Sequence, residues 1–295
     1  MSESITILAP AKINIFLNVL SKRDDGYHEI ESILQTVGIF DRLNITKNEP
    51  DGDEKIISVS CDDTTLCGEN NIVYRAAETF FEHSRIEKFN VGFYISKRIP
   101  KMSGLGGGSS DAAAAMIALN ELYGTEFSIA EMCEMGAKVG SDVPFLIKKG
   151  TCFVGGKGDV IESCTPMPDC VIAIAVPKDT KISTPEAYGL IDGVKVSASI
   201  DGMKNALIDC SIEKIGENIF NKFEYIQPQN SKIFDIKRKL AAQGSPAVLM
   251  SGSGSAVFAL FDNAQSAKKA AESLEDDAET FVCAPVRRAY SYIEK

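Results

Sequence analysis

A glycine-rich segment between an expected strand and an expected helix constrains the fold of this chain more than any other feature. The segment Gly104–Ser110 follows an alternating apolar stretch, Phe89–Ile99, that ends at Pro100, and precedes an alanine-rich stretch that reaches Leu122. Glycines permit positive φ and leave backbone N–H groups uncovered. A helix that begins directly after them adds its free amides and the positive end of its dipole.

This junction predicts a turn that cradles a di- or triphosphate. The hydroxyls of Ser109 and Ser110 are candidate ligands for phosphate oxygens or for Mg²⁺. A flexible loop without a ligand is the alternative. Three consecutive glycines at a strand-to-helix junction favour the phosphate site, because they are costly unless the backbone must approach something closely.

Other nucleotide-binding motifs do not match the sequence. A P-loop is absent, since Gly156-Lys157 is followed by Gly158 instead of Ser or Thr. The dinucleotide fingerprint fails at its third glycine, where Ser109 stands. The Gly-x-Ser-x-Gly motif of hydrolases and the motif set of protein kinases are also missing.

The bulk composition describes a folded, acidic protein. With 295 residues the chain has room for two domains, and Thr165–Asp169 with its two prolines is the best boundary, giving domains 1–165 and 166–295. The net charge of −10 disfavours nucleic-acid and anionic-membrane partners. No apolar run approaches the ~20 residues of a membrane span, and no signal peptide is recognisable, so we expect a cytoplasmic protein.

Hydrophobic periodicity predicts a mixed α+β chain. The stretch 5–20 alternates apolar and polar residues, which indicates a strand with one buried face. Further strands are expected at 56–60, 89–99, 151–154, 160–163, 171–176, 247–250, 256–261 and 280–286, with 30–45 β-rich but ambiguous. Helices are expected at 71–83, 109–122, 128–138, 231–243 and 263–274.

Two polar residues of the first strand and one aspartate form a candidate catalytic group. Lys12 and Asn14 lie on the polar face of the first strand, and Asp142 lies among small and apolar residues. An aspartate that stays ionised in such a setting needs a cation nearby, for which Lys12 is a candidate. The alternative is two unrelated surface residues.

Two turns are candidates for substrate contacts. The segment Ser251–Gly254 joins two short strands, and it either lays its backbone along a substrate or forms a plain hairpin. Tyr27 and His28 follow a turn at Asp24–Gly26 and can hold a ring by stacking and edge hydrogen bonds. A surface histidine without a ligand is the alternative for His28.

Taken together, these motifs resemble the GHMP kinase superfamily, the kinases of galactose, homoserine, mevalonate and phosphomevalonate. The resemblance rests on the segments Pro10–Asn14, Asp25–Glu29, Leu105–Ala113, Ser141–Pro144 and Ser251–Gly254, in order along the chain. It is strongest to the branch that phosphorylates a cytidine-diphosphate-linked methylerythritol, because sister kinases do not share the Asp-Gly-Tyr-His segment. It implies a two-domain fold, with an N-terminal domain like ribosomal protein S5 domain 2 and a ferredoxin-like C-terminal domain.

The resemblance also implies roles for single residues. Asp142 would be the catalytic base, Lys12 would orient the hydroxyl, and Lys97 would lie near the adenine. ATP would contact Lys97, Pro100, Gly104, Leu105, Gly106, Gly107, Gly108, Ser109 and Ser110. The substrate would contact Asn14, Tyr27, His28, Asp142, Tyr188, Ser251, Gly252, Ser253 and Gly254.

The implied reaction is transfer of a phosphoryl group from ATP, with Mg²⁺, to the 2-hydroxyl of that small substrate. The expected assembly is a monomer or a weak homodimer. Two alternatives stay open. One is a kinase for another small alcohol, such as homoserine or mevalonate, which would leave Tyr27 and His28 without a purpose. The other is a non-catalytic nucleotide-binding protein, against which the presence of both Lys12 and Asp142 argues.

Overall fold

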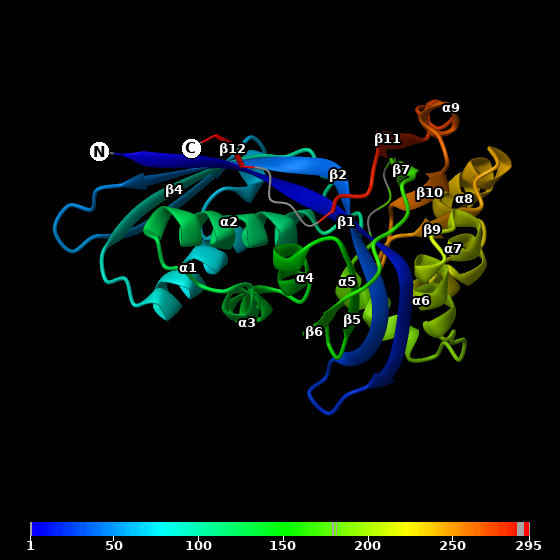
Figure 1. Ribbon diagram of the computed structural model, residues 1–295, viewed down its shortest axis with the longest axis horizontal. Helices are drawn as coiled ribbons and strands as arrows, with labels where there is room; N and C mark the ends of the chain where they lie inside the picture. Colours follow the sequence, from blue (N-terminus) through cyan, green and yellow to red (C-terminus); the bar gives the residue numbers. More distant parts are fainter. Residues whose placement is uncertain (1, 179, 181, 288–291, 295) are drawn as a thin grey trace.

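Two very long antiparallel strands form the frame of the molecule. A computed structural model describes residues 2–178, 180, 182–287 and 292–294. Strand β1 (Glu3–Lys22) pairs along nearly its whole length with β2 (His28–Asn48). The far end of this hairpin bends away from the first half of the molecule and reaches the second (Figure 1).

The hairpin contributes to the cores of both halves. Ile5 and Ile7 pack with the helices of the first half, whereas Ile13 and Ile15 pack with the second sheet. The strand is therefore buried on both faces, and the prediction of one solvent-exposed face is wrong. Lys12 and Asn14, expected on the polar face, are only 5% and 4% exposed.

The first sheet carries the longer strands. Its order is β12-β1-β2-β4-β3, where β3 spans Lys55–Cys61, β4 Phe89–Ser96 and β12 Tyr292–Glu294. Strand β5 (Thr151–Gly155) pairs with β2, and β6 (Val160–Ser163) pairs with β5. Strand β8 (Phe220–Asn221) pairs in parallel with β1. Two strands from late in the chain thus join this sheet. The division into domains at residues 165 and 166 stays a prediction.

Four helices accompany the first sheet, on one side in Figure 1. They are α1 (Ile72–Ser84), α2 (Gly107–Tyr123), α3 (Ile129–Val139) and α4 (Val143–Lys148), with the short 3₁₀ helix η1 at Thr64–Leu66. Ala112–Ala115 are buried within α2 because their small side chains let the helix pack closely on the hairpin. Ser128 caps α3 in the capping box that the sequence predicted.

The second sheet is antiparallel in the order β11-β7-β10-β9. Its strands are β7 (Val171–Pro177), β9 (Ala247–Met250), β10 (Val257–Phe261) and β11 (Ala278–Cys283). Helix α8 (Lys232–Ala242) precedes β9 and α9 (Ala264–Glu272) follows β10. Numbered along the chain this order is 4-1-3-2, the ferredoxin-like arrangement that the resemblance implied.

The long helices agree with the sequence patterns, whereas the short helices were missed. The last expected strand, 280–286, instead spans Ala278–Cys283. Helices α5 (Thr184–Ile191), α6 (Asp201–Ile208) and α7 (Ile212–Asn218), the 3₁₀ helix η2 (Lys222–Ile226) and α4 were not predicted. Each spans eight residues or fewer, so that hydrophobic periodicity has too few turns to emerge.

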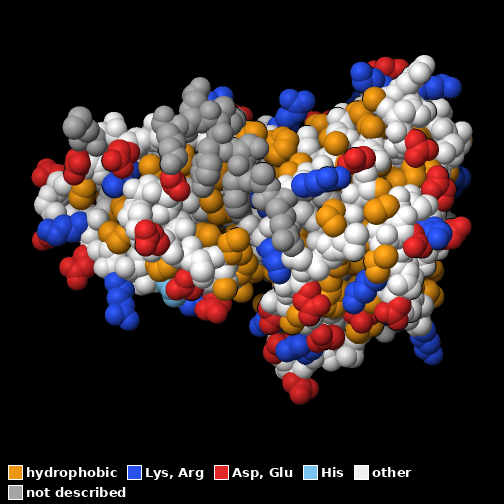
Figure 2. All heavy atoms as spheres, viewed as in Figure 1, with side chains coloured by type: hydrophobic (Ala, Val, Ile, Leu, Met, Phe, Trp, Pro, Cys, Tyr) orange, Lys and Arg blue, Asp and Glu red, His pale blue; other side chains and the backbone are white. Residues whose placement is uncertain are grey.

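The surface mixes charges of both signs. Figure 2 shows acidic and basic side chains interspersed over the visible face. In the part of the chain that the structure describes, no helix is long and apolar enough to span a bilayer.

Candidate active site

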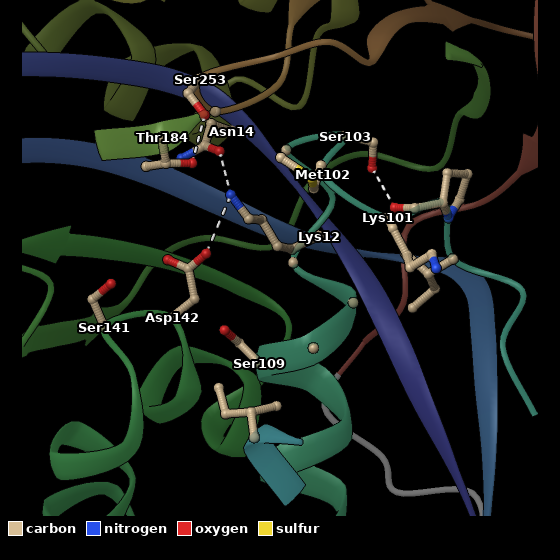
Figure 3. A pocket seen from close by; sticks show the side chains of 18 of the residues that line it. Lys12, Asn14, Lys101, Met102, Ser103, Ser109, Ser141, Asp142, Thr184 and Ser253 are labelled. Carbon is tan, nitrogen blue, oxygen red and sulfur yellow. Dashed lines mark hydrogen bonds and ion pairs between the residues drawn. The ribbon is translucent and has the colours of Figure 1, made fainter. Parts of the chain in front are cut away.

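A cleft of about 690 Å³ collects most of the predicted site residues. Its walls come from β1, the start of α2, the loop before α4, helix α5 and the turn after β9 (Figure 3). A volume of this size is typical of sites for small molecules. The predicted residues that line it are Lys12, Asn14, Lys97, Pro100, Gly104, Gly106, Gly107, Gly108, Ser109, Asp142, Tyr188, Gly252 and Ser253.

The glycine-rich turn ends in an uncapped helix. Helix α2 begins at Gly107, and its N-cap is Gly106 with a φ of 71° and no side-chain cap. The amino end of the helix therefore faces the cleft without a side-chain oxygen of its own to neutralise it. Backbone amides and the positive end of the helix dipole suit a phosphate here.

Close packing accounts for two of the glycines. A Cβ on Gly104 would lie 2.1 Å from the carbonyl oxygen of Ser251. A Cβ on Gly106 would lie 2.9 Å from Cγ of Lys12. The turn thus rests against both β1 and the turn after β9, and it is a packed element of the cleft.

Lys12 lies at the centre of the predicted catalytic group (Figure 3). Its Nζ donates to Oδ1 of Asn14 at 2.8 Å and forms an ion pair with Oδ2 of Asp142 at 3.5 Å. Asn14 is itself fixed, because its Nδ2 donates to Oγ of Ser32 at 2.9 Å. The structure therefore brings together the lysine and the aspartate that the sequence proposed as partners.

Asp142 reaches the cleft from the start of helix α4. It is the N-cap residue of that helix, and the following side chains, Val143 and Phe145, are buried. Its own side chain is 38% exposed. A carboxylate that is anchored on a packed helix and still open to the cleft can accept a proton from a bound hydroxyl.

The turn Ser251–Gly254 is a hairpin connection between β9 and β10 that also borders the cleft. Oγ of Ser251 donates to the carbonyl of Gly104 at 2.9 Å. Nδ2 of Asn221 donates to the carbonyl of Gly252 at 2.8 Å, and Oγ of Ser253 lies 2.9 Å from Oγ1 of Thr184. Gly252 and Ser253 thus line the cleft, whereas Ser251 and Gly254 do not.

Lys97 borders the cleft, but its amine belongs to a buried cluster. Its Nζ contacts Oδ2 of Asp41 and lies 2.6 Å from Oδ2 of Asp111. Burial opposes the charge on Lys97, yet the carboxylates of Asp111 and Asp41 raise its pKa above the usual value. Burial likewise holds the pKa of Asp111 well above its usual range. The expected place of Lys97 beside an adenine stays a prediction.

Of the aromatic residues expected to hold a ring, Tyr27 and His28 lie at the hairpin end of β1 and β2 and do not line the cleft, whereas Tyr188 lies on α5. His28 and Tyr188 have ring centroids 5.3 Å apart with a tilt of 31°. Tyr188 lines the cleft and packs edge-on against Phe223 at 4.9 Å. Tyr27 stands at the tip of the hairpin, 56% exposed, with Nζ of Lys157 5.1 Å from its ring.

Two residues of the predicted phosphate turn do not face the cleft. Oγ of Ser110 donates to the carbonyl of Pro10 at 2.6 Å, and its N–H donates to the carbonyl of Gly106. The Leu105 side chain is buried, and its carbonyl accepts the N–H of Lys12 at 2.9 Å. Of the two serines predicted as hydroxyl ligands, only Ser109 lines the cleft, because helix geometry turns Ser110 into the core.

Several residues of the site were missed from sequence. Thr184, Asn221 and Asp41 contact residues 31 to 69 positions away in the chain, and no local pattern marks such contacts. Asp111 directly follows the glycine-rich turn, and a charged residue before an alanine run was the one available signal.

No group of three acidic, histidine or cysteine side chains capable of holding a metal occurs among the described residues. A kinase Mg²⁺ is commonly bound by one or two carboxylates together with the substrate phosphates. Ser109 lines the cleft and could add a hydroxyl oxygen to the phosphate oxygens that hold the ion.

Comparison with known proteins assigns both halves of the chain. The family model for the GHMP kinases N terminal domain matches residues 71–150, and the model for the GHMP kinases C terminal matches residues 204–279. A homoserine kinase from Cytophaga hutchinsonii superposes with a TM-score of 0.78 at 18% identity, over 98% of this chain and 97% of that one. At that identity the likeness shows the fold alone, and the predicted GHMP kinase fold is confirmed.

Relatives of known name are considerably closer. The 4-diphosphocytidyl-2-C-methyl-D-erythritol kinase of Syntrophotalea carbinolica is 35% identical over 91% of this chain and 94% of its own. That of Caldicellulosiruptor saccharolyticus is 38% identical over 90% and 91%. A crystal structure of 4-(cytidine 5'-diphospho)-2C-methyl-D-erythritol kinase matches at 27% identity with a TM-score of 0.74, over 97% and 100%. The chain therefore belongs to the GHMP kinases and, within them, to the 4-diphosphocytidyl-2-C-methyl-D-erythritol kinase family.

Proposed function

We propose that this chain transfers the γ-phosphoryl group of ATP to the 2-hydroxyl of 4-diphosphocytidyl-2-C-methyl-D-erythritol, a step of the non-mevalonate route to isoprenoid precursors. The main support is the pair Lys12 and Asp142, 3.5 Å apart, in the same cleft as the uncapped amino end of α2. The names of relatives that are 35–38% identical over most of the chain support the substrate.

The proposed chemistry needs few groups. The substrate 2-hydroxyl oxygen attacks the γ-phosphorus, the bond from that phosphorus to the β–γ bridging oxygen breaks, and Asp142 accepts the hydroxyl proton. Lys12, held by Asn14, orients the attacking oxygen beside Asp142. The amides at the start of α2 stabilise the phosphate charge. General-base catalysis of this kind contributes roughly 10²–10⁴-fold in rate.

We also propose Mg²⁺ as the companion of ATP. When bound, the ion neutralises charge on the phosphates. Ser109 is the residue that would share it with the nucleotide, because it lines the cleft beside the amino end of α2. Pro100 and Lys97 border the same side of the cleft and remain candidates for the nucleoside end of ATP.

The cytidine end of the substrate is assigned to the hairpin end of the cleft. The His28 and Tyr188 rings lie side by side, Tyr27 precedes His28 at the tip of the hairpin, and such rings bind a pyrimidine by stacking and edge hydrogen bonds. Gly252 and Ser253 would border the methylerythritol part. We further propose a cytoplasmic monomer or weak homodimer without nucleic-acid or membrane partners, in line with the net charge of −10.

The test is a turnover assay. Purified protein is incubated with ATP, Mg²⁺ and the cytidyl substrate, and with homoserine or mevalonate in parallel. Mass spectrometry detects the added phosphoryl group, and phosphorus–proton NMR correlation locates it. The proposal expects one product, phosphorylated at the 2-hydroxyl, from the cytidyl substrate alone. Phosphorylation of homoserine or mevalonate instead would assign another substrate, and ATP binding without transfer would favour a non-catalytic protein.

A further inference from the structure

An acidic residue outside the predicted site holds the histidine of the proposed cytidine pocket. Asp192 follows helix α5 as its C-cap residue, and its Oδ1 lies 2.7 Å from Nε2 of His28. The two residues are 164 positions apart in the chain. The His28 side chain is 6% exposed and the Asp192 side chain 50%, so the carboxylate holds a nearly buried ring from the solvent side.

The charge state of Asp192 determines what this contact does to the imidazole. The hydrogen bond from His28 lowers the pKa of Asp192, and the nearby positive groups of Lys22 and Lys222 lower it further. An ionised carboxylate accepts hydrogen bonds and cannot donate them. Nε2 of His28 must therefore carry the proton of this contact, and in the neutral imidazole Nδ1 is then left as an acceptor.

The imidazole is also held beside the cleft by its other neighbours. His28 opens strand β2 and pairs with Lys22 across the hairpin. Its ring lies beside the ring of Tyr188, which lines the cleft and packs against Phe223. Backbone pairing, ring contact and the bond to Asp192 together leave the imidazole little freedom to turn.

We propose that Asp192 is a positioning residue that selects cytosine over uracil through His28. By holding the proton on Nε2, Asp192 makes Nδ1 of His28 an acceptor for the exocyclic amino group of cytosine. Uracil carries a carbonyl oxygen at that position, so that two acceptors would face each other. A site whose polar group hydrogen-bonds the correct ligand rejects an analogue that leaves this protein group without a partner. This inference rests on the proposed function.

A purely structural role for Asp192 makes a different prediction. If the contact only latches α5 to β2, its loss lowers stability and affects both pyrimidines equally. If it sets the proton position, its loss acts on the preference between pyrimidines. An asparagine in its place can still accept from Nε2 through its amide oxygen, whereas an alanine cannot. Asp192→Asn therefore removes the charge and keeps the acceptor, whereas Asp192→Ala removes both.

The experiment compares kcat/KM for the cytidyl substrate and for its uridine-diphosphate counterpart. It uses the wild type, Asp192→Ala, Asp192→Asn and the control Asp209→Ala. Asp209 is a suitable control because it is another ion-paired carboxylate, 46% exposed, that does not line the cleft. CDP and UDP dissociation constants from calorimetry provide the same ratio without turnover.

We expect Asp192→Ala to lower the cytidine-to-uridine ratio about tenfold, near the lower end of what a hydrogen bond to a charged group contributes. KM for ATP and kcat should stay within about twofold, since the change is remote from the phosphates. Asp192→Asn should keep most of the ratio, and Asp209→Ala all of it.

An unchanged ratio in Asp192→Ala, by kinetics and by calorimetry, overturns the inference. So does a wild type that prefers the uridine compound, because a doubly protonated imidazole would then present a donor. A wild type that binds CDP over UDP but transfers no phosphoryl group overturns the proposed function alone.

Discussion

Replacement of Gly106 by alanine tests whether the glycine-rich turn sets the position of Lys12. Gly106 is the N-cap of α2 with a φ of 71°, and Gly124 is the C-cap of the same helix with a φ of 59°. Alanine is strained at both positions by about 1–2 kcal/mol, because both lie in the left-handed region. Only at Gly106 does the new Cβ meet a catalytic side chain, since Gly124 has no heavy atom within 4 Å of its added Cβ.

The size of the effect follows from the contact with Lys12. The added Cβ would lie 2.9 Å from Cγ and 3.2 Å from Cε of Lys12, whereas carbon atoms in contact stay about 3.5–4.0 Å apart. Lys12 must therefore shift by roughly 0.6–1.1 Å, the difference between 2.9 Å and those distances. Its Nζ then leaves the 2.8 Å bond to Asn14 or the ion pair with Asp142. A misplacement of about 1 Å can cost on the order of 10²-fold in rate.

The assay pairs stability with kinetics. Chemical denaturation should show that Gly106→Ala and Gly124→Ala each lose about 1–2 kcal/mol of unfolding free energy. Steady-state kinetics should show kcat lowered about 10–100-fold in Gly106→Ala and within about twofold of wild type in Gly124→Ala. Equal kcat values in two equally destabilised variants would refute the reasoning, because the contact with Lys12 would then be without consequence.

Two further predictions concern single side chains near the cleft. Ser110→Ala should cost about 1–2 kcal/mol of stability, because it removes the hydroxyl that donates to the buried carbonyl of Pro10, and KM for ATP should not change. Ser109→Ala should raise KM for ATP with little loss of stability. The reverse pattern in the two variants would contradict the assignment. Burial, with a smaller contribution from Asp142, raises the pKa of Tyr188 to about 12, so the folded chain keeps the phenol proton at a pH where the unfolded chain, with a pKa of about 10, has lost it. The unfolding free energy should therefore be unaffected below pH ~10 and should fall as pH rises toward 12, and the fall should be shallower in Tyr188→Phe; parallel curves for the two proteins would show that Tyr188 ionises equally in both states.

Much of the fold was predictable because its long elements repeat their pattern over many residues. Helix α3 shows its start in Ser128 and Glu131, and both close the capping box in the structure. The strand character of β1 was also evident, but its burial was not. Alternation reports the polarity of side chains and not what covers them, so Lys12 and Asn14 were assigned to an exposed face.

In the candidate site, too, contiguous motifs were predictable from the sequence, whereas contacts between distant residues were not. The turn Gly104–Ser110 was identifiable because glycines and a helix start are consecutive in sequence. The partnership of Lys12 and Asp142 joins β1 to α4, and sequence supplied only the matching charges. Asp192 escaped notice because its partner lies 164 residues away, and an acidic residue after a helix is ordinarily a solvated one.

The most direct test of the central claim measures the Asp142→Asn variant with ATP, Mg²⁺ and the cytidyl substrate. The variant keeps the shape of the side chain and removes the carboxylate that accepts the proton. We predict that kcat falls about 10²–10⁴-fold, or about 3–5 kcal/mol of barrier, while the dissociation constant for ATP stays within about twofold. A kcat within about threefold of wild type, with ATP still bound, would contradict the role of Asp142 as the base beside Lys12.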